Sequence, residues 1–224
     1  DYVLRGLTWG FDLGFVAGSP LTKADATSAS ALGNREVVGE YLANEVEEGA
    51  MAGPFPRPPL VGLQVSRFSL QEKPEGRGWR LIFDLSYPPG SSVNAGIPKS
   101  VRTVNFVSFS DVIRAIVGVG KGARLAKFDI SRAYRHVPVR EEDRCLLGLT
   151  WDGMFYVDLT LSFGAASACA IFTKVADFLM QIFQSVSFAS IWYHYLDDFL
   201  AICAARYKEA GFSKDFAGVV DLCA

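Results

Sequence analysis

Apolar residues recur along this chain with helical and strand spacing, and the two spacings predict a series of short elements. A helix is predicted over 35–48 with Gly49 as its stop, and the apolar residues on its face are Val37, Val38, Tyr41, Leu42 and Val46. A short helix is predicted over 111–117 and a long apolar helix over 165–183. We interpret the apolar face of the first helix as a packing surface.

Short apolar runs bounded by turn residues predict strands over 63–70, 79–85, 125–130, 146–151 and 154–159. A Gly-rich turn at 73–78 joins the first two, and Asp152-Gly153 is a two-residue hairpin signal between the last two. Two further apolar runs flank Asp197 and Asp198 and predict a final hairpin. This order of elements predicts an α+β fold, with an antiparallel sheet backed by helices.

The proline-rich stretch 54–59 must be extended, because proline disfavours helical backbone at its own position and at the residue before it. We therefore place a boundary at residue 56. It separates an N-terminal helical segment, 1–56, from a main domain, 57–224. With 224 residues and 50% hydrophobic content, the chain is long enough to bury a substantial core.

Two adjacent carboxylates lie within an otherwise apolar run, in the sequence Tyr195-Leu196-Asp197-Asp198. Two carboxylates about 4 Å apart repel by roughly 4 kcal/mol at an effective dielectric near 20, so a neighbouring cation would stabilise them. The pair therefore indicates a divalent metal site. A polar hairpin tip without a metal is the alternative, because Asp-Asp is common in turns.

A third acid, Asp129, lies near the end of the strand-like run 125–130. If that strand end lies beside the hairpin, three carboxylates would form the oxygen-rich environment that Mg²⁺ prefers. Two such ions about 3.5–4 Å apart can activate an attacking hydroxyl and neutralise a leaving oxygen in phosphoryl transfer. Taken alone, Asp129 would be a turn or cap residue.

Four motifs occur in order along the chain: Lys73-x6-Arg80, Phe128-Asp129-x4-Tyr134, the run LSFGAASA at 161–168, and Tyr195-Leu196-Asp197-Asp198. In this order and spacing they resemble the finger and palm motifs of reverse transcriptases. The flanking sequence resembles retrotransposon enzymes, most closely those of DIRS-type, tyrosine-recombinase elements, at 79–86, 90–94 and 146–151. The resemblance covers nearly the whole chain.

The resemblance implies the right-hand fingers and palm of an RNA-directed DNA polymerase. Such an enzyme uses two Mg²⁺ ions, or Mn²⁺ in their place, to join dNTPs to a primer on an RNA or DNA template. Asp129 and Asp197 would bind metal directly, the backbone carbonyl of Ile130 would assist, and Asp198 would be the lesser ligand. A thumb and an RNase H region, which usually follow in the family, are absent from this chain.

Five residues acquire nucleotide-binding roles from the resemblance: Lys73, Arg80, Tyr134, Phe163 and Gly164. Lys73 and Arg80 would hold the triphosphate, because arginine binds phosphate bidentately and lysine acts as a point charge. Tyr134 would block a ribose 2′-hydroxyl. Phe163 opens the segment before the long helix, where Gly164 would permit close approach of the backbone to nucleotide or template. For Lys73 and Arg80 the alternative is a solvated hairpin tip, and for Tyr134 it is a tyrosine of the core.

The charge distribution favours nucleic acid as a partner, although the net charge is only −2. Residues 57–144 hold 15 Lys and Arg against 8 Asp and Glu, whereas 1–56 hold 3 against 8 and 145–224 hold 4 against 8. Most of the cations in the middle block are arginines, which suit bidentate phosphate contacts better than lysines do. A solvated basic surface is the simpler alternative.

Other residues indicate less. The 4 cysteines are widely spaced without a CxxC pair, so neither a zinc site nor a disulfide framework is indicated, and we expect an intracellular location in cytoplasm or nucleus. The apolar stretch 178–196 contains too many polar residues to favour a membrane span, so no membrane partner is expected.

His136 and His194 are interpreted as hydrogen-bonded structural histidines in strand regions. Asp84 could orient its strand or pair with an arginine.

Two other functions compete with the polymerase. An RNA-dependent RNA polymerase shares the palm chemistry, but commonly carries Gly-Asp-Asp where this chain has Tyr195 before its acids, and Tyr134 argues against acceptance of a 2′-hydroxyl. A decayed or domesticated transposon remnant would only bind nucleic acid or a protein partner. The intact acids favour activity, and the missing thumb leaves the activity of the fragment alone open.

Overall fold

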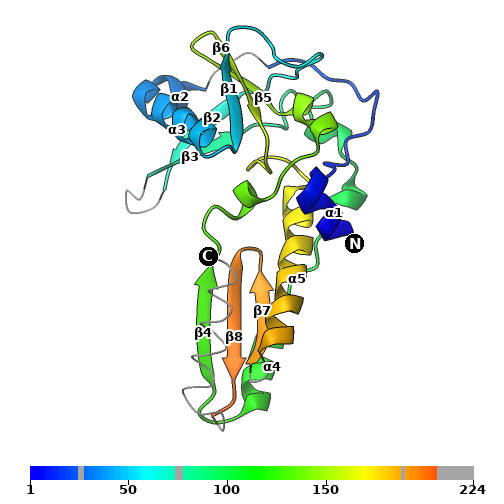
Figure 1. Ribbon diagram of the computed structural model, residues 1–224, viewed down its shortest axis with the longest axis vertical. Coiled ribbons are helices and arrows are strands. Elements are labelled where there is room, and N and C mark those ends of the chain that lie inside the picture. The colour runs from blue at the N-terminus through cyan, green and yellow to red at the C-terminus, as the bar shows by residue number, and fades with distance from the viewer. Residues whose placement is uncertain (25–27, 74–77, 188–189, 206–224) are drawn as a thin grey trace. The chain divides into compact units, whose positions relative to one another are not determined.

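The computed structural model describes residues 1–24, 28–73, 78–187 and 190–205 (Figure 1). The chain divides into two compact units, one formed by Asp1–Thr103 with Tyr134–Ala170 and the other by Val104–Ala133 with Ile171–Ala224. Both combine helices with antiparallel sheets, so the predicted α+β class is confirmed.

The first unit contains two separate sheets and the N-terminal helices. Its helices are α1 (Tyr2–Trp9), α2 (Ala29–Leu32) and α3 (Arg35–Glu47). One sheet has the strand order β1-β6-β5 and the other is the pair β2-β3, and the strands are β1 (Met51–Phe55), β2 (Phe68–Glu72), β3 (Trp79–Phe83), β5 (Gly148–Trp151) and β6 (Met154–Asp158). The strand pairs of these two sheets are antiparallel.

Several local predictions for this unit are confirmed. Helix α3 covers the predicted range and buries Val38 and Leu42 from the predicted apolar face. The β5–β6 hairpin turns at Asp152 (φ 49°) and Gly153 (φ 75°), the positive pair that a type I′ turn requires. Strands β2 and β3 also pair as predicted, and most of the turn between them, at 74–77, lies outside the described residues.

The strand predicted over 63–70 is wrong in its first half. Strand β2 begins only at Phe68, and the preceding residues bond to β5 and the turn before it instead. Gln64 N–H donates to Cys145 O at 2.7 Å and Ser66 N–H to Gly148 O at 2.9 Å. Leu63, Val65 and Leu70 are all buried, so the sequence pattern alone did not separate the residues that bond toward β5 from those of β2.

Strand β1 was not predicted, because its sequence Met-Ala-Gly-Pro-Phe contains residues that disfavour strands. It forms at the edge of β6, where Met51 lies opposite Asp158. Residues 1–56 belong to the same compact unit as residues 57–103, so no unit boundary falls at residue 56. The functional boundary that we placed there stays a prediction.

The second unit is a three-stranded antiparallel sheet with helices packed on it. The sheet order is β4-β8-β7, with β4 (Arg124–Asp129), β7 (Ser190–Tyr195) and β8 (Asp198–Cys203) (Figure 1). Helix α5 (Ala168–Val186) inserts Phe183 between aromatic rings of the sheet, 5.3 Å from the ring of Phe199 and 5.4 Å from that of Trp192. Helix α4 (Phe109–Val119) packs against β8 and starts with a capping box between Ser108 and Asp111.

Helix α5 begins three residues later than the predicted start at 165, because the preceding turn is tied to another loop. Asn94 Oδ1 accepts from Ala166 N–H at 2.8 Å, and Asn94 Nδ2 donates to Gly164 O at 2.7 Å. By length and composition α5 could cross a membrane, a test that core helices of soluble proteins also pass. Its buried residues include Phe172, Val175 and Phe183.

Candidate functional site

The predicted acidic hairpin lies at one end of the second unit's sheet. Strands β7 and β8 pair so that Tyr195 lies opposite Asp198, which leaves Leu196 and Asp197 as a two-residue turn. Leu196 has φ 54°, a left-handed conformation that is uncommon for a residue other than glycine. The turn therefore presents Asp197 and Asp198 at the sheet end through a constrained backbone.

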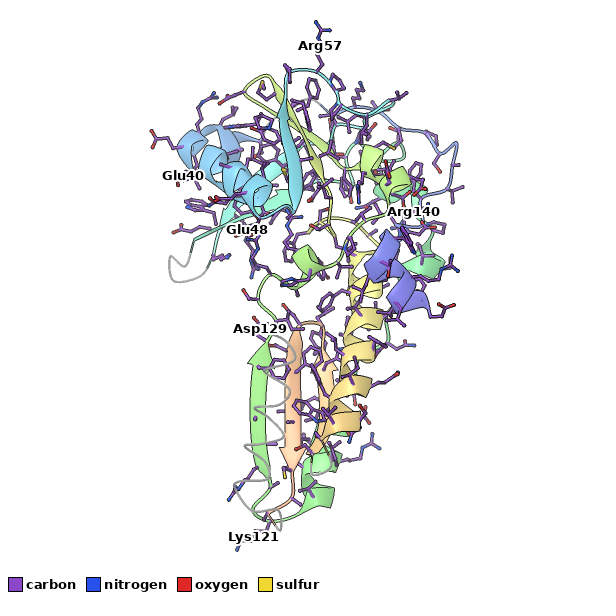
Figure 2. All side chains as sticks on the ribbon, in the orientation of Figure 1. Glu40, Glu48, Arg57, Lys121, Asp129 and Arg140 are labelled. Atoms are coloured by element: carbon purple, nitrogen blue, oxygen red, sulfur yellow. The ribbon has the colours of Figure 1, made fainter. Side chains whose placement is uncertain are left out.

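Asp129 reaches the same sheet end from β4, as predicted. The register places Asp129 directly opposite Asp198, and directly opposed residues have Cβ atoms about 4.5–5.5 Å apart. Ile130 N–H donates to Asp197 O at 3.1 Å, which joins the end of β4 to the turn. Figure 2 shows Asp129 at the end of its strand. The fold thus brings the three acids from two distant parts of the sequence to the tips of adjacent strands.

A lysine of the chain already lies against these carboxylates. Lys127 Nζ is 2.9 Å from Asp198 Oδ1, and the two side chains are 62% and 44% exposed. Asp198, with smaller contributions from Asp129 and Asp197, raises the pKa of Lys127. An exposed ion pair of this kind contributes little to stability. The ion pair shows that the carboxylates at this end of the sheet attract a cation.

The acids fit a hard divalent cation, although the predicted cage of three carboxylates is not formed. No group of three or more His, Cys, Asp or Glu side chains within the described ranges is arranged to hold a metal ion. Carboxylates repel one another without a cation, and Lys127 engages Asp198. Mg²⁺ commonly takes only one or two carboxylates and completes its shell with waters and substrate phosphates. Asp129 and its neighbours supply that smaller donor set.

Four of the five predicted nucleotide-binding residues line a single cavity of about 330 Å³ in the first unit: Arg80, Tyr134, Phe163 and Gly164. The rings of Tyr134 and Phe163 stack with centroids 4.9 Å apart and planes 24° apart. The Arg80 guanidinium lies 5.9 Å from the Phe163 ring centroid. The cavity thus combines a cation with a stacked aromatic wall.

Gly164 is required by its backbone surroundings. A Cβ atom at this position would lie 2.2 Å from Phe83 O, and its φ is 150°. The backbone of strand β3 therefore approaches this glycine closely. Whether a nucleotide also approaches stays a prediction.

Lys73 is not among the residues that line the cavity. It directly follows β2, where its backbone N–H donates to Gly78 O at 2.8 Å. Arg80 instead lies opposite Gln71, which does line the cavity. The predicted convergence of Lys73 and Arg80 on one triphosphate stays a prediction.

Sequence reasoning missed Asn94 and Gln71. Asn94 is buried and fixes the Gly164 loop from both sides through its amide. Asn94 acts as a positioning group, because its amide also donates to Ser86 Oγ at 2.9 Å, but its partners in the Gly164 loop are 70 or more positions away in sequence. Gln71 would have been found from the β2–β3 register, since it is the cross-strand partner of Arg80.

The remaining single-residue predictions have clear outcomes. His194 is a structural histidine as predicted, with Nε2 2.9 Å from Asp177 Oδ1 and Nδ1 3.3 Å from Leu196 O. His136 lies exposed in a 3₁₀ turn, Ala133–His136, so its predicted strand environment is wrong. Asp84 pairs with Arg67, whose guanidinium also stacks on the Tyr87 ring.

Comparison with known proteins identifies relatives of this fold. Residues 88–219 match the family described as reverse transcriptase (RNA-dependent DNA polymerase). The foamy viral protease-reverse transcriptase in complex with ds DNA has a TM-score of 0.67 at 15% identity, covering 94% of this chain and 32% of that one. The native prototype foamy virus protease-reverse transcriptase has a TM-score of 0.63 at 18% identity, covering 92% and 24%.

At such identities these likenesses establish the fold alone, and the chain spans a third or less of the length of both solved chains. No curated protein sequence matches this chain. The matched segment 88–219 includes Asp129, Tyr134 and the acidic hairpin, and begins after Lys73 and Arg80.

Proposed function

The chain belongs to the reverse transcriptase family, and from this we propose that it forms the fingers and palm of an RNA-directed DNA polymerase. The observation that carries the proposal is the register of β4 and β8, which sets Asp129 opposite Asp198 beside the turn with Asp197. Its substrates are dNTPs and a primer on an RNA or DNA template. On the flanking motifs we assign it to the DIRS-type, tyrosine-recombinase retroelements, whose polymerases continue into a thumb and RNase H region.

Divalent metal would be held at the acidic sheet end. Asp129 and Asp197 are the direct ligands in this proposal, assisted by the Ile130 carbonyl, and Asp198 is the lesser ligand. The contact between Asp198 and Lys127 supports that ranking, because part of the Asp198 charge is already compensated. When bound, Mg²⁺ or Mn²⁺ would activate the primer 3′-hydroxyl and neutralise charge on the reacting phosphates.

The cavity in the first unit would receive the nucleotide. Arg80 would hold phosphate oxygens bidentately, and Lys73 would add charge from the end of β2. Tyr134, held flat against Phe163, would exclude a ribose 2′-hydroxyl and so favour deoxynucleotides. Gly164 and Phe163 would form the wall beside the base or template.

Several arginines of the basic block, residues 57–144, already bind other groups of the chain. This limits how many of them can bind phosphate. Ion pairs with acids engage Arg67, Arg114, Arg135 and Arg140, and bonds to backbone carbonyls engage Arg102 and Arg144. We therefore assign nucleic-acid contact to exposed members of the block such as Arg57, Lys99 and Lys121. Fewer phosphate contacts are expected than the sequence count suggested.

Primer extension tests the proposed function. A polypeptide that carries this chain together with a thumb should extend a DNA primer on an RNA template in the presence of Mg²⁺. Asp129→Asn and Asp197→Asn should each abolish extension, because both remove a metal-binding charge at unchanged side-chain size. Folding is checked by circular dichroism.

Asp152→Asn is the matched control, since Asp152 also lies in a two-residue hairpin turn but in the other unit. It should leave extension intact. Substantial extension by Asp197→Asn would refute the acid assignment. A folded wild type that binds primer-template but never extends it would favour the remnant, and a preference for ribonucleotides would favour an RNA polymerase.

A further inference from the structure

A buried ionic cluster lies immediately next to Tyr134 in sequence. Arg135 Nη1 lies 2.5 Å from Asp158 Oδ1 and 3.1 Å from Thr160 Oγ1, and Arg135 Nε lies 2.9 Å from Glu45 Oε2. The side chains of Arg135, Glu45 and Asp158 are 9%, 6% and 0% exposed. Three ionisable groups are thus taken out of water together.

The cluster joins three elements that are far apart in the sequence. Glu45 comes from the last turns of α3, Asp158 ends β6, and Arg135 lies in the 3₁₀ turn Ala133–His136. A guanidinium that hydrogen-bonds one buried carboxyl group and forms an ion pair with a second tolerates little displacement, because any movement leaves a buried charge without its partner. The 3₁₀ turn is therefore fixed to α3 and β6 at this residue.

Tyr134 shares that fixed backbone. Its ring lines the cavity together with Arg80 and Gly164 and stacks on Phe163, whereas the next side chain enters the ionic cluster. Val137, three residues further along, is also buried. The backbone on which Tyr134 stands is thus held from outside the cavity by the neighbouring guanidinium.

We propose that Arg135, clamped by Glu45 and Asp158, is a positioning residue that holds the Tyr134 ring at the sugar-selecting wall of the nucleotide cavity. Helix α3 thereby takes part in substrate selection from outside the cavity. The inference rests on the proposed function, because sugar selection by Tyr134 is part of that function.

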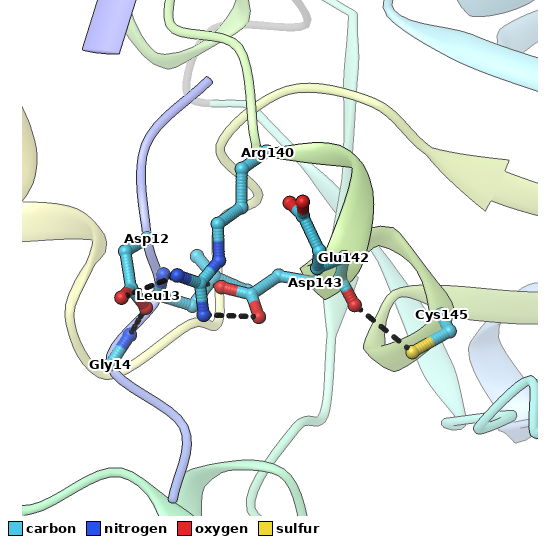
Figure 3. A network of polar contacts seen from close by, with 7 residues as sticks. All are labelled: Asp12, Leu13, Gly14, Arg140, Glu142, Asp143 and Cys145. Carbon is cyan, nitrogen blue, oxygen red and sulfur yellow. Dashed lines mark hydrogen bonds and ion pairs between the residues drawn. The ribbon is translucent and has the colours of Figure 1, made fainter. Parts of the chain in front are cut away.

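A second arginine of the same unit provides a matched comparison. Arg140 Nη1 lies 2.7 Å from Asp12 Oδ2 and Arg140 Nη2 lies 3.0 Å from Asp143 Oδ1 (Figure 3). Asp143 is buried and also accepts from Leu13 N–H at 2.8 Å. Arg140 therefore also joins two carboxylates of this unit, although its side chain is more exposed than that of Arg135, and it is not adjacent to a residue that lines the nucleotide cavity.

The test measures sugar discrimination, the ratio of kcat/KM for a dNTP to kcat/KM for the matching rNTP, on one primer-template. Tyr134→Val should collapse the ratio, because the steric block is removed. Arg135→Met should lower it by about tenfold or more through displacement of the ring, with most of the change in KM for the rNTP. The double variant should match Tyr134→Val alone, since Arg135 acts through Tyr134.

Controls separate positioning from loss of stability. Arg140→Met should lower the urea midpoint of unfolding and leave the discrimination ratio unchanged. Arg135→Lys keeps the charge but loses the two-directional contact, so it should restore only part of the ratio. If Arg135→Met does not fold, Asp158→Asn takes its place, because it retains side-chain size and should shift the ratio in the same direction.

The two proposals fail in different ways. If the wild type discriminates through Tyr134 while Arg135→Lys and Asp158→Asn keep the wild-type ratio, the positioning role is refuted alone. An Arg140→Met ratio that falls as far as that of Arg135→Met also refutes it, because the effect would then be general destabilisation. A wild type that does not extend a primer, or whose ratio ignores Tyr134→Val, refutes the proposed sugar site itself.

Discussion

Gly164 shows how far a single residue can be constrained by its surroundings. Its φ of 150° and the 2.2 Å that would separate an added Cβ from Phe83 O leave no room for a side chain. Gly164→Ala should therefore lower the free energy of unfolding by about 1–3 kcal/mol, the usual range for a strained backbone position. Because Gly164 also lines the nucleotide cavity, KM for a dNTP should rise. Urea unfolding and steady-state kinetics measure the two effects.

Gly39→Ala is the control for that substitution. Gly39 lies within α3, where an added Cβ meets nothing within 4 Å, so alanine should raise the free energy of unfolding by about 0.5–1 kcal/mol. If both glycine substitutions change the free energy of unfolding in the same direction, the close approach to Phe83 is not the cause of the effect at Gly164.

Asp158 of strand β6 and Glu45 of helix α3 lie in one buried cluster, and from this we expect the stability of the protein to depend on pH. Burial raises the pKa of Asp158 to about 7, although Arg135 acts in the opposite direction, and Glu45 raises it further. Between about pH 4 and 7 the folded protein thus holds a proton that the unfolded chain has released. The contribution of Asp158 to stability should fall as pH rises through this window, by at most about 1.4 kcal/mol per pH unit.

Asp158→Asn should flatten that part of the stability curve, measured as the urea midpoint at successive pH values. Glu45→Gln removes a charge that raises the Asp158 pKa, so it should move the sloping region to lower pH. Arg135, Glu45 and Thr160 are the groups that act on the Asp158 pKa in this cluster. A midpoint that falls between pH 4 and 7 as steeply in Asp158→Asn as in the wild type would rule out Asp158 as the source.

The charge distribution of the whole chain predicts that its affinity for nucleic acid falls as the salt concentration rises. Each phosphate contact contributes about 0.9 to the slope of log affinity against log salt concentration on duplex DNA. Because Arg67, Arg114, Arg135 and Arg140 are engaged by acids of the chain, we expect a slope of about −3 to −6. Fluorescence anisotropy with a labelled primer-template at several salt concentrations measures it.

A variant in which Arg140 is replaced by methionine should keep the wild-type slope, since its guanidinium is committed to Asp12 and Asp143. A slope near zero would show that phosphate contacts do not hold the duplex, and would favour a protein-binding role for this chain.

The sequence by itself determined the elements whose signals are local. The periodicity of α3, the Asp152-Gly153 turn and the paired acids each lie within a few residues, so spacing alone predicted them. Tertiary structure decided what depends on distant partners. Residues 64–66 bond to β5 and the turn before it because burial can be supplied by either sheet, and Asn94 reaches the Gly164 loop 70 positions away. The buried charges around Arg135 follow the same rule, since only folding brings a carboxyl group of α3 and one of β6 to a single guanidinium.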